Sequence, residues 1–297
     1  MRAAWAALAL LAAPAAAGAQ ADTLPLQAVL ANGYRFAYAD RGSGPPLLLV
    51  HGALTDLRFW TAQLDGLAGS ARVLALSRRA HYPNPWRPED PPAGFTTTAA
   101  DLAAIIRALR LERPVVMVHS WAAPAGLELA RRFPGLVGGL VLVNPVVDSL
   151  IPDPARRAAV AAARRQAYDE ALQVFDARAP GPAVNRLLAA WFGPGITLEA
   201  LAGDTRERLL ANAQTLPTAA APQPAIGCAE LQSIDLPVLL LGSADGPPEE
   251  RETLATLARC LPRARLHSIP LGGRTLPRSQ PDSVNAAVRD FMQPGAP

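Results

Sequence analysis

Apolar and amphipathic segments alternate along most of this chain of 297 residues. The apolar segments have the length of buried parallel strands and are bounded by turn residues. They lie at Pro46–Val50, Arg72–Ser77, Pro114–His119, Leu136–Asn144, Pro237–Gly242 and Ala264–Ile269. The amphipathic segments have the length of helices and lie at Leu57–Leu67, Thr97–Leu111, Trp121–Phe133, Pro248–Leu261 and Ser283–Met292. The alternation predicts an α/β fold, with a mostly parallel, doubly wound sheet covered by helices on both faces.

Two regions depart from this alternation. Near the N-terminus, Leu26–Leu30 and Tyr34–Asp40 flank an Asn-Gly pair, which predicts an antiparallel hairpin at the sheet edge. Residues 149–224 show no strand pattern, only helical segments rich in Arg and Ala that are separated by Pro and Gly. We therefore expect residues 22–148 and 225–297 to form one α/β core, into which residues 149–224 are inserted as a helical cap.

The first 21 residues have the organisation of a secretory signal peptide. Arg2 precedes an apolar run from Ala3 to Ala17, and the sequences Ala-Gly-Ala and Ala-Gln-Ala that follow each fit a cleavage site. The run is shorter than the roughly 20 residues that a membrane-spanning helix needs, and no later segment is long and uncharged enough. We predict export to the periplasm or out of the cell, with no membrane span.

The composition excludes several classes of protein. Half of the residues are hydrophobic and 18% are charged, which is typical of a globular chain and not of a disordered one. The net charge is only +3, and the basic residues, all arginines, are scattered among acids, so we expect no nucleic-acid partner. The sequence contains no dinucleotide-binding glycine fingerprint, Walker loop or H-E-x-x-H motif, and we expect no cofactor.

The chain contains two cysteines, Cys228 and Cys260. Disulfides persist outside the cytoplasm, so in an exported chain pairing is the favoured interpretation and two buried thiols are the alternative. The two cysteines form no C-x-x-C motif and have no histidine near them in the sequence, and we therefore expect no metal site.

Ser120 directly follows a predicted strand and precedes a predicted helix. A serine at such a turn has the geometry of a nucleophile elbow, whose usual pattern is G-x-S-x-G. Here Ala122 is small enough for the turn, whereas Val118 replaces the first glycine. A serine that merely caps the helix is the structural alternative.

A second turn, His51-Gly52-Ala53, follows the strand Pro46–Val50. Gly52 lets the backbone turn, so that the N–H of Ala53 can point at a developing oxyanion. The N–H of Trp121, the residue after the predicted nucleophile, would be the second donor. We therefore predict an oxyanion hole formed by Ala53 and Trp121.

Four stretches of sequence around these turns carry a family resemblance. They read DRGSGPPLLLVHGA, ELARRFPGLVGGLVLVNP, PVLLLGSAD and QPDSVNAAVRDF. In order and spacing the chain resembles the α/β-hydrolase superfamily over nearly its whole mature length. The resemblance implies an α/β-hydrolase fold with a helical insertion after the sixth strand, and a triad in the chain order Ser, acid, His.

The resemblance assigns the acid and the base to loops late in the chain. Asp245, three residues beyond Gly242, matches the acid position, and Asp148 is the other place where this fold can put its acid. The base should lie in the turn Leu271–Thr275, where Arg274 occupies the position expected for histidine. A guanidinium, with a pKa above about 12, cannot accept a proton from serine at neutral pH. We expect Arg274 to form an ion pair with Asp245 or to bind an anionic group.

The chain contains four histidines, and we expect three of them not to replace the missing base. His51 is expected to be a structural hydrogen-bonding residue beside the oxyanion turn, the side chain of His119 is aimed away from Ser120, and His267 lies in the middle of a strand. His81, in the loop SRRAHYPNP at the C-terminal edge of the sheet, is the possible surrogate base. A structural or binding role for His81 is the alternative.

These residues support two hypotheses from different classes. The first is an exported serine hydrolase with Ser120 as nucleophile and Asp245 as acid, acting on a carboxylic ester or a related small acyl substrate. The second is a catalytically degenerate relative, with Arg274 at the histidine position, that binds a small ligand. Both expect a small-molecule partner in a largely apolar pocket. The aromatic residues that could line it are Trp86, Trp121, Trp191 and Phe192, with packing within the core and cap as the alternative.

Overall fold

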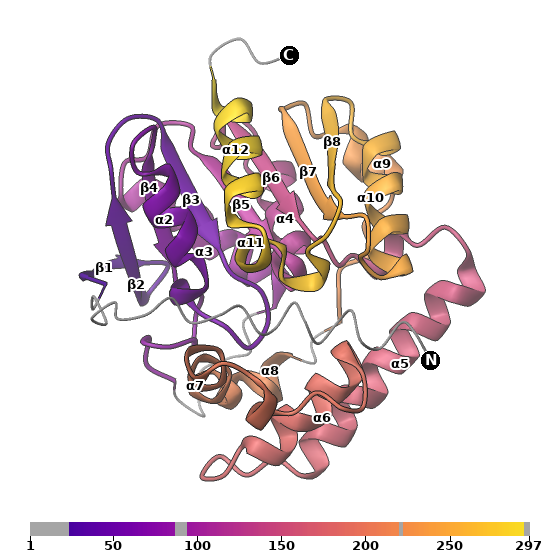
Figure 1. The fold of residues 1–297 in the computed structure, drawn as a ribbon. Coiled ribbons are helices and arrows are strands. Elements are labelled where there is room, and N and C mark those ends of the chain that lie inside the picture. Colours follow the sequence, from indigo (N-terminus) through magenta and orange to yellow (C-terminus); the bar gives the residue numbers. More distant parts are fainter. Residues whose placement is uncertain (1–23, 87–93, 220–221, 294–297) are drawn as a thin grey trace.

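The computed structural model describes residues 24–86, 94–219 and 222–293 (Figure 1). The predicted signal peptide, residues 1–21, lies outside the described residues. No helix in the described part of the chain is both long and apolar enough to cross a membrane.

A sheet of eight strands in the order β1-β2-β4-β3-β5-β6-β7-β8 forms the centre of the described chain. Its strands are β1 (Leu26–Ala31), β2 (Tyr34–Arg41), β3 (Pro46–Val50), β4 (Arg72–Leu76), β5 (Val115–His119), β6 (Gly139–Val143), β7 (Val238–Ser243) and β8 (Ala264–Ile269). From β4 to β8 all neighbours are parallel, whereas β2 is antiparallel to both β1 and β4. The predicted edge hairpin is present, and Asn32 and Gly33 both have positive φ at its turn.

Helices cover both faces of the sheet because the buried strand residues alternate between them. Leu47 and Leu49 of β3 belong to one apolar cluster, whereas Leu48 and Val50 belong to the other. The first cluster includes residues of α2 (Thr61–Leu67), α11 (Leu276–Ser279) and α12 (Pro281–Met292). The second includes residues of α3 (Phe95–Ala108), α4 (Ala123–Arg132), α9 (Cys228–Gln232) and α10 (Pro248–Cys260). The predicted doubly wound α/β fold is therefore confirmed.

A helical insertion between β6 and β7 lies across one end of the strands (Figure 1). Its helices are α5 (Pro154–Gln173), α6 (Gly181–Phe192), α7 (Gly203–Ala211) and α8 (Leu216–Ala219). They share an apolar cluster of their own, to which Leu54 of the loop after β3 also belongs. Because Leu54 follows the predicted oxyanion turn, this cluster joins the insertion to the part of the core that holds the candidate site.

Short 3₁₀ helices connect several of these elements. They are η1 (Leu57–Trp60), η2 (Ser120–Ala122), η3 (Asp148–Leu150), η4 (Leu198–Ala200), η5 (Ala213–Thr215) and η6 (Gly273–Thr275). Two of them, η2 and η6, lie in loops that follow the C-terminal ends of β5 and β8, where ligands bind in open parallel sheets.

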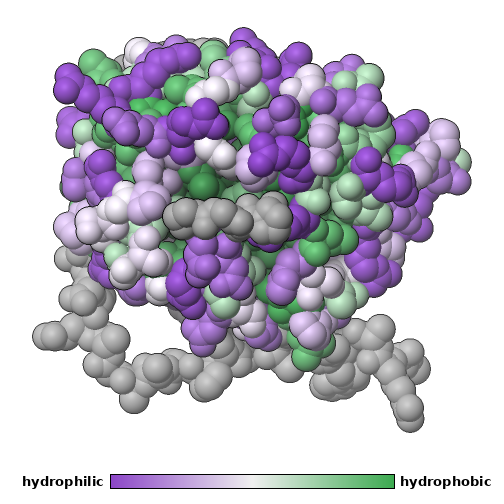
Figure 2. Space-filling model, turned by 90° about the horizontal axis from the view of Figure 1, so that it is seen from above, coloured by the Kyte–Doolittle hydropathy of each residue, from purple (hydrophilic) through white to green (hydrophobic). Residues whose placement is uncertain are grey.

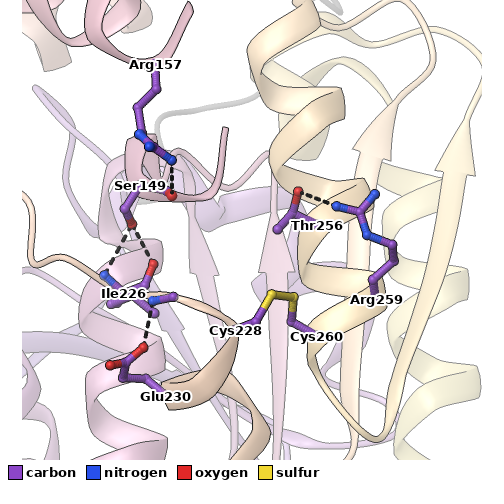
Figure 3. The surroundings of a disulfide bond; sticks show 9 residues. Ser149, Arg157, Ile226, Cys228, Glu230, Thr256, Arg259 and Cys260 are labelled. Carbon is purple, nitrogen blue, oxygen red and sulfur yellow. Dashed lines mark hydrogen bonds between the residues drawn. A yellow bond between two sulfur atoms is a disulfide. The ribbon is translucent and has the colours of Figure 1, made fainter. Parts of the chain in front are cut away.

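The two ends of the insertion are tied together. The Ser149 hydroxyl donates to the Ile226 carbonyl at 2.8 Å and accepts from the Ile226 N–H at 3.2 Å (Figure 3). Nearby, the Gln223 side chain accepts from the Asp148 N–H at 2.8 Å and donates to the Val146 carbonyl at 3.0 Å. These four hydrogen bonds fix the insertion where it leaves and rejoins the core.

The two cysteines form a disulfide, in agreement with the favoured interpretation of the sequence. Cys228 begins α9 and Cys260 ends α10, so the bond joins two helices on the same side of the sheet (Figure 3). The end of the molecule opposite the insertion carries hydrophilic side chains among smaller hydrophobic patches (Figure 2).

Candidate functional site

Ser120 lies at the sharp turn between β5 and α4. Its backbone φ is +51°, in the left-handed region that non-glycine residues seldom occupy. Such a conformation costs free energy and persists where the surrounding structure imposes it. Here the Ser120 carbonyl accepts hydrogen bonds from the N–H groups of Ala123 and Val146, which fix the turn from two sides.

Val118 fits at this turn because the facing helix has a glycine. A Cβ atom built on Gly126 of α4 would lie 3.0 and 3.1 Å from the two methyl groups of Val118. The usual elbow pattern has a glycine two residues before the serine. Here that position is Val118, and the space for its side chain comes from Gly126 in the helix packed against it.

The loop after β3 packs directly on the elbow. A Cβ atom built on Gly52 would lie 3.1 Å from His119 Nδ1 and 3.4 Å from Ser120 Cβ, so a larger residue would push the two turns apart. The Ala53 N–H makes no backbone hydrogen bond with the described residues, and Trp121 is the second residue of η2, where N–H groups lack partners within the helix. Trp121 adjoins Ser120 in the chain and Ala53 follows Gly52, which packs on Ser120. The oxyanion role of their N–H groups stays a prediction.

The Ser120 hydroxyl makes no hydrogen bond with any described residue. His119, its neighbour, is buried and turns away: its Nε2 contacts the Arg274 carbonyl at 3.1 Å, and its ring stacks on Phe59 with the centroids 4.6 Å apart. Burial lowers the pKa of His119 to about 4, so its imidazole is neutral at pH 7. As expected, the side chain of His119 is aimed away from Ser120.

His81 does not contact Ser120 in the structure. Its Nδ1 lies 2.8 Å from the Arg79 carbonyl and its Nε2 lies 3.1 Å from Arg78 Nη2, so both ring nitrogens are engaged elsewhere. The ring of His51 is 4.8 Å away, between centroids, and its Nε2 accepts from the Arg78 N–H at 2.9 Å. Burial lowers the pKa of both histidines well below the usual value, with the positive charge of Arg78 as the next cause.

Asp245 lies in the loop after β7 and is exposed. Its Oδ1 accepts from the Gly273 N–H at 3.0 Å and also contacts the Ser243 hydroxyl. It forms no ion pair with Arg274 among the described residues, so that alternative of the sequence prediction is wrong. Asp245 is nevertheless held one residue away from position 274.

Arg274 is instead held by two glutamates of α10. Its Nη2 lies 2.7 Å from Glu249 Oε1 and its Nη1 lies 2.7 Å from Glu250 Oε1. Burial raises the pKa of Glu250 to about 7, and the opposing influence of Arg274 is the next largest. The predicted pairing with Asp245 is not made because α10 begins at Pro248, three residues beyond Asp245, and its first turn brings two further carboxylates to the guanidinium.

Asn144 and a second ion pair extend this charged region. Asn144, just after β6, donates from Nδ2 to Glu250 Oε2 at 3.2 Å and to the Gly273 carbonyl at 3.1 Å. Asp148, the other position considered for the acid, pairs with Arg164 of α5 at 2.9 Å. A hollow next to the elbow is lined partly by Val146, Asp148, Arg164 and Glu250.

Trp121 belongs to a row of aromatic rings between the insertion and the core. Its ring centroid lies 5.3 Å from that of Phe95 and 6.4 Å from that of Tyr168 on α5. Trp191 continues the row, 6.4 Å from Tyr168. Trp86, which the sequence also suggested as a pocket residue, is 36% exposed and makes no ring contact with the described residues.

Sequence reasoning missed several residues of this region. The pair Glu249 and Glu250 carried a usable signal, because two acids open the helix that follows the predicted catalytic acid. Asn144, Arg78 and Tyr168 carried none, since their proximity depends on how the insertion and the loops are placed. No group of three or more His, Cys, Asp or Glu side chains suited to a metal ion occurs among the described residues.

The similarity to known proteins extends over most of the chain. Residues 47–287 match the Alpha/beta hydrolase family. The chain belongs to this family. A haloalkane dehalogenase of Sphingobium indicum is 25% identical over 282 residues, covering 88% of this chain and 93% of the dehalogenase. A 2-hydroxy-6-oxo-2,4-heptadienoate hydrolase of Pseudomonas putida is 33% identical over 121 residues, 40% of this chain and 44% of that enzyme.

Solved structures of hydrolases share the fold. A hydrolase from Pseudomonas aeruginosa superimposes with a TM-score of 0.73 at 24% identity and covers 93% of this chain and 100% of its own. Naproxen esterase from Bacillus subtilis has a TM-score of 0.68 at 18% identity, with coverages of 97% and 94%. At these identities the likeness establishes the α/β-hydrolase fold, and membership of the family implies a small-molecule substrate or ligand.

Proposed function

We propose that this α/β-hydrolase family member binds a small ligand between its helical cap and its sheet and does not turn over esters through Ser120. The observation that carries the proposal is the state of Arg274. It occupies the position where the family resemblance expects the catalytic histidine, and its guanidinium contacts Glu249 and Glu250 at 2.7 Å each.

The backbone of η6 supports the assignment of position 274 to the missing base. The Arg274 carbonyl lies 3.1 Å from His119 Nε2, and His119 is the residue before Ser120. A histidine at position 274 would therefore start beside the elbow. The arginine has no lone pair to accept the serine proton, and its side chain is directed to α10 instead. Without a base, the hydroxyl of Ser120 stays a weak nucleophile.

Serine hydrolase activity is the second candidate. The positive φ of Ser120 favours it, because strained backbone of this kind gathers at active sites. The names of two similar proteins also favour it, since they are a heptadienoate hydrolase and an esterase. This candidate needs an unusual base, and His81 would have to leave its contacts with Arg78 and Arg79 to serve.

Ester hydrolysis separates the two candidates. The mature protein and Ser120→Ala would be assayed with a panel of 4-nitrophenyl esters of acetate, butyrate and benzoate. We expect equal, background rates for both proteins. A rate in the wild type that exceeds the Ser120→Ala rate by tenfold or more would refute the proposal and establish a serine hydrolase.

We also propose that the chain is exported and that residues 1–21 are removed. The leader-like sequence supports this, and so does the Cys228–Cys260 disulfide, because such bonds persist in oxidising compartments. N-terminal sequencing of the protein recovered from the periplasm or medium of a bacterial host tests it. A chain that retains Met1 and stays in the cytoplasm would contradict it.

A further inference from the structure

Arg78, just after β4, is a cation that no described carboxylate neutralises. Arg78 is only partly exposed, and it forms no salt bridge with any described residue. Its neighbour Arg79 pairs with Asp101 at 2.7 Å, and Arg274 pairs with two glutamates. Taking a guanidinium partly out of water without a counter-charge costs free energy unless a bound group compensates.

The hydrogen bonds of Arg78 leave much of its guanidinium unused. Nη2 donates to the Gly52 carbonyl at 2.7 Å and lies 3.1 Å from Nε2 of His81. Nε is buried and has no hydrogen-bond partner, and Nη1 makes no hydrogen bond with the described residues. Burial lowers the pKa of Arg78 to about 10, so it still carries its charge at pH 7.

The position of Arg78 connects it to the candidate site. Gly52, whose carbonyl it contacts, packs on the elbow so closely that an added Cβ would lie 3.4 Å from Ser120 Cβ. On the other side, Tyr168 of the cap lies close enough to interact electrostatically with Arg78. Tyr168 also belongs to the aromatic row with Trp121. Gly52 therefore connects Arg78 to the Ser120 turn, and Tyr168 connects it to the aromatic row.

We propose that Arg78 binds the anionic group of an aromatic carboxylate that lies against Trp121 and Tyr168 beside Ser120. This inference rests on the proposed ligand-binding function and names the chemical class of its ligand. The guanidinium supplies charge-assisted hydrogen bonds to the carboxylate, and the aromatic row supplies apolar contact with the ring. This proposal assigns anion binding to Arg78 and not to Arg274, because Arg274 is already held by two carboxylates.

Isothermal titration calorimetry with 2-naphthoate, and with the neutral 2-naphthamide as comparison, tests the inference. We expect 2-naphthoate to bind the wild type, and Arg78→Gln to weaken it at least about tenfold, the size of one charge-assisted hydrogen bond. Binding of 2-naphthamide should change less than threefold. Arg165→Gln, at an exposed arginine of the same cap helix as Tyr168, is the matched control and should leave both affinities unchanged.

A second measurement on the wild type avoids dependence on the fold of the variant. Phenylglyoxal modifies accessible arginines, and peptide mass spectrometry would follow Arg78 with and without 2-naphthoate. We expect 2-naphthoate to slow modification of Arg78 at least fivefold and that of Arg165 not at all. Equal modification rates, equal affinity of Arg78→Gln for 2-naphthoate, or no binding of 2-naphthoate to the wild type would each overturn the inference.

Failure of the anion inference differs from failure of the proposed function. If 2-naphthamide binds as tightly as 2-naphthoate and ester turnover stays at background, ligand binding stands and the carboxylate assignment falls. If Ser120-dependent ester turnover is found while Arg78→Gln still weakens 2-naphthoate, the proposed absence of turnover falls and the anion site stands.

Discussion

The two halves of the candidate site differ in how closely their geometry follows the serine hydrolase that the sequence predicts. On the serine side, formed by β3, β5 and the turns that follow them, Ser120 has a strained φ and Gly52 packs closely on the elbow. On the base side, after β7 and β8, Arg274 is bound to Glu249 and Glu250. The serine side depends on backbone geometry, whereas the base side depends on the chemistry of one side chain. One substitution at position 274 would therefore be enough to remove the predicted base without disturbing the elbow.

The largest expected effect comes from restoring the base. Arg274→His places an imidazole beside Asp245 and Glu249 and removes the guanidinium. We expect hydrolysis of 4-nitrophenyl acetate to rise by about 100-fold or more, the usual contribution of general-base catalysis. Stopped-flow or steady-state absorbance at neutral pH measures it. Arg274→Gln is the matched control, because it also removes the charge but supplies no strong base.

The outcome of this substitution tests the contrast between the two halves. A rise that Ser120→Ala cancels would show that the serine side is intact and lacks only its base. If a folded Arg274→His protein stays at the rate of Arg274→Gln, the serine side is also impaired, and the contrast would have to be abandoned.

The disulfide anchors the helix that supplies the base-side glutamates. The Cys228→Ser, Cys260→Ser double variant removes a cross-link between residues 32 positions apart. We expect the free energy of unfolding to fall by about 3 to 4 kcal/mol, which urea unfolding measures. Amide hydrogen exchange should quicken in α9 and α10 more than in α4. Uniform acceleration across the sheet would show that the bond does not act on the base side in particular.

Acid should destabilise the protein through His119. Its folded pKa is about 4, below the unfolded value near 6.5, so the unfolded chain binds more protons between these values. Stability is therefore complete above about pH 6.5 and falls as the pH drops toward 4. The shift corresponds to about 3 kcal/mol of pH-dependent stability. His51 and His81 act in the same direction.

Comparison of the pH curves isolates this contribution. Urea titrations at pH 4.5 and pH 7 give the loss of unfolding free energy on acidification. In His119→Gln this loss should be smaller than in the wild type by about 2 to 3 kcal/mol. His267→Gln, at an exposed position of β8, is the control and should follow the wild-type curve. If the unfolding free energy of His119→Gln falls with pH as steeply as that of the wild type, the acid-induced loss of stability does not come from His119.

The smallest effect concerns how the elbow is packed. In Gly126→Ala the new Cβ would lie about 3.0 Å from the methyl groups of Val118, and we expect a loss of about 1 to 3 kcal/mol of stability. The second substitution Val118→Ala should recover most of it. Gly203→Ala, at an open position of the cap, should cost nothing comparable. If Val118→Ala does not restore the stability lost in Gly126→Ala, then the side chain of Val118 does not occupy the space that Gly126 leaves.

The fold and the serine side could be predicted because local patterns determine them. Apolar runs and helical spacing predicted the strands and helices, with ends that differ by a few residues, such as β6, which begins at Gly139 and not at Leu136. The elbow at Ser120 follows from a strand that runs directly into a helix. The match of Val118 to Gly126 could not be foreseen, since it needs the packing of that helix on the strand.

The base side could be predicted only in part. The family resemblance predicted that position 274 lies in the turn after the last strand, but it did not predict the partners of Arg274. Asp245 is the nearest acid in the family pattern, yet the first turn of α10 supplies two others at shorter range. The proximity of Arg78 to Tyr168 depends on where the cap helix α5 packs, and no local pattern in the sequence predicts that packing.

Covalent labelling of the wild-type protein tests the central claim most directly. The mature protein would be incubated with a fluorophosphonate probe at several pH values beside Ser120→Ala, and its intact mass recorded. We predict that the folded wild type gains no probe mass, because the Ser120 hydroxyl makes no hydrogen bond with any described residue. Stoichiometric labelling that disappears in Ser120→Ala would contradict the account, since it would show a working base despite Arg274.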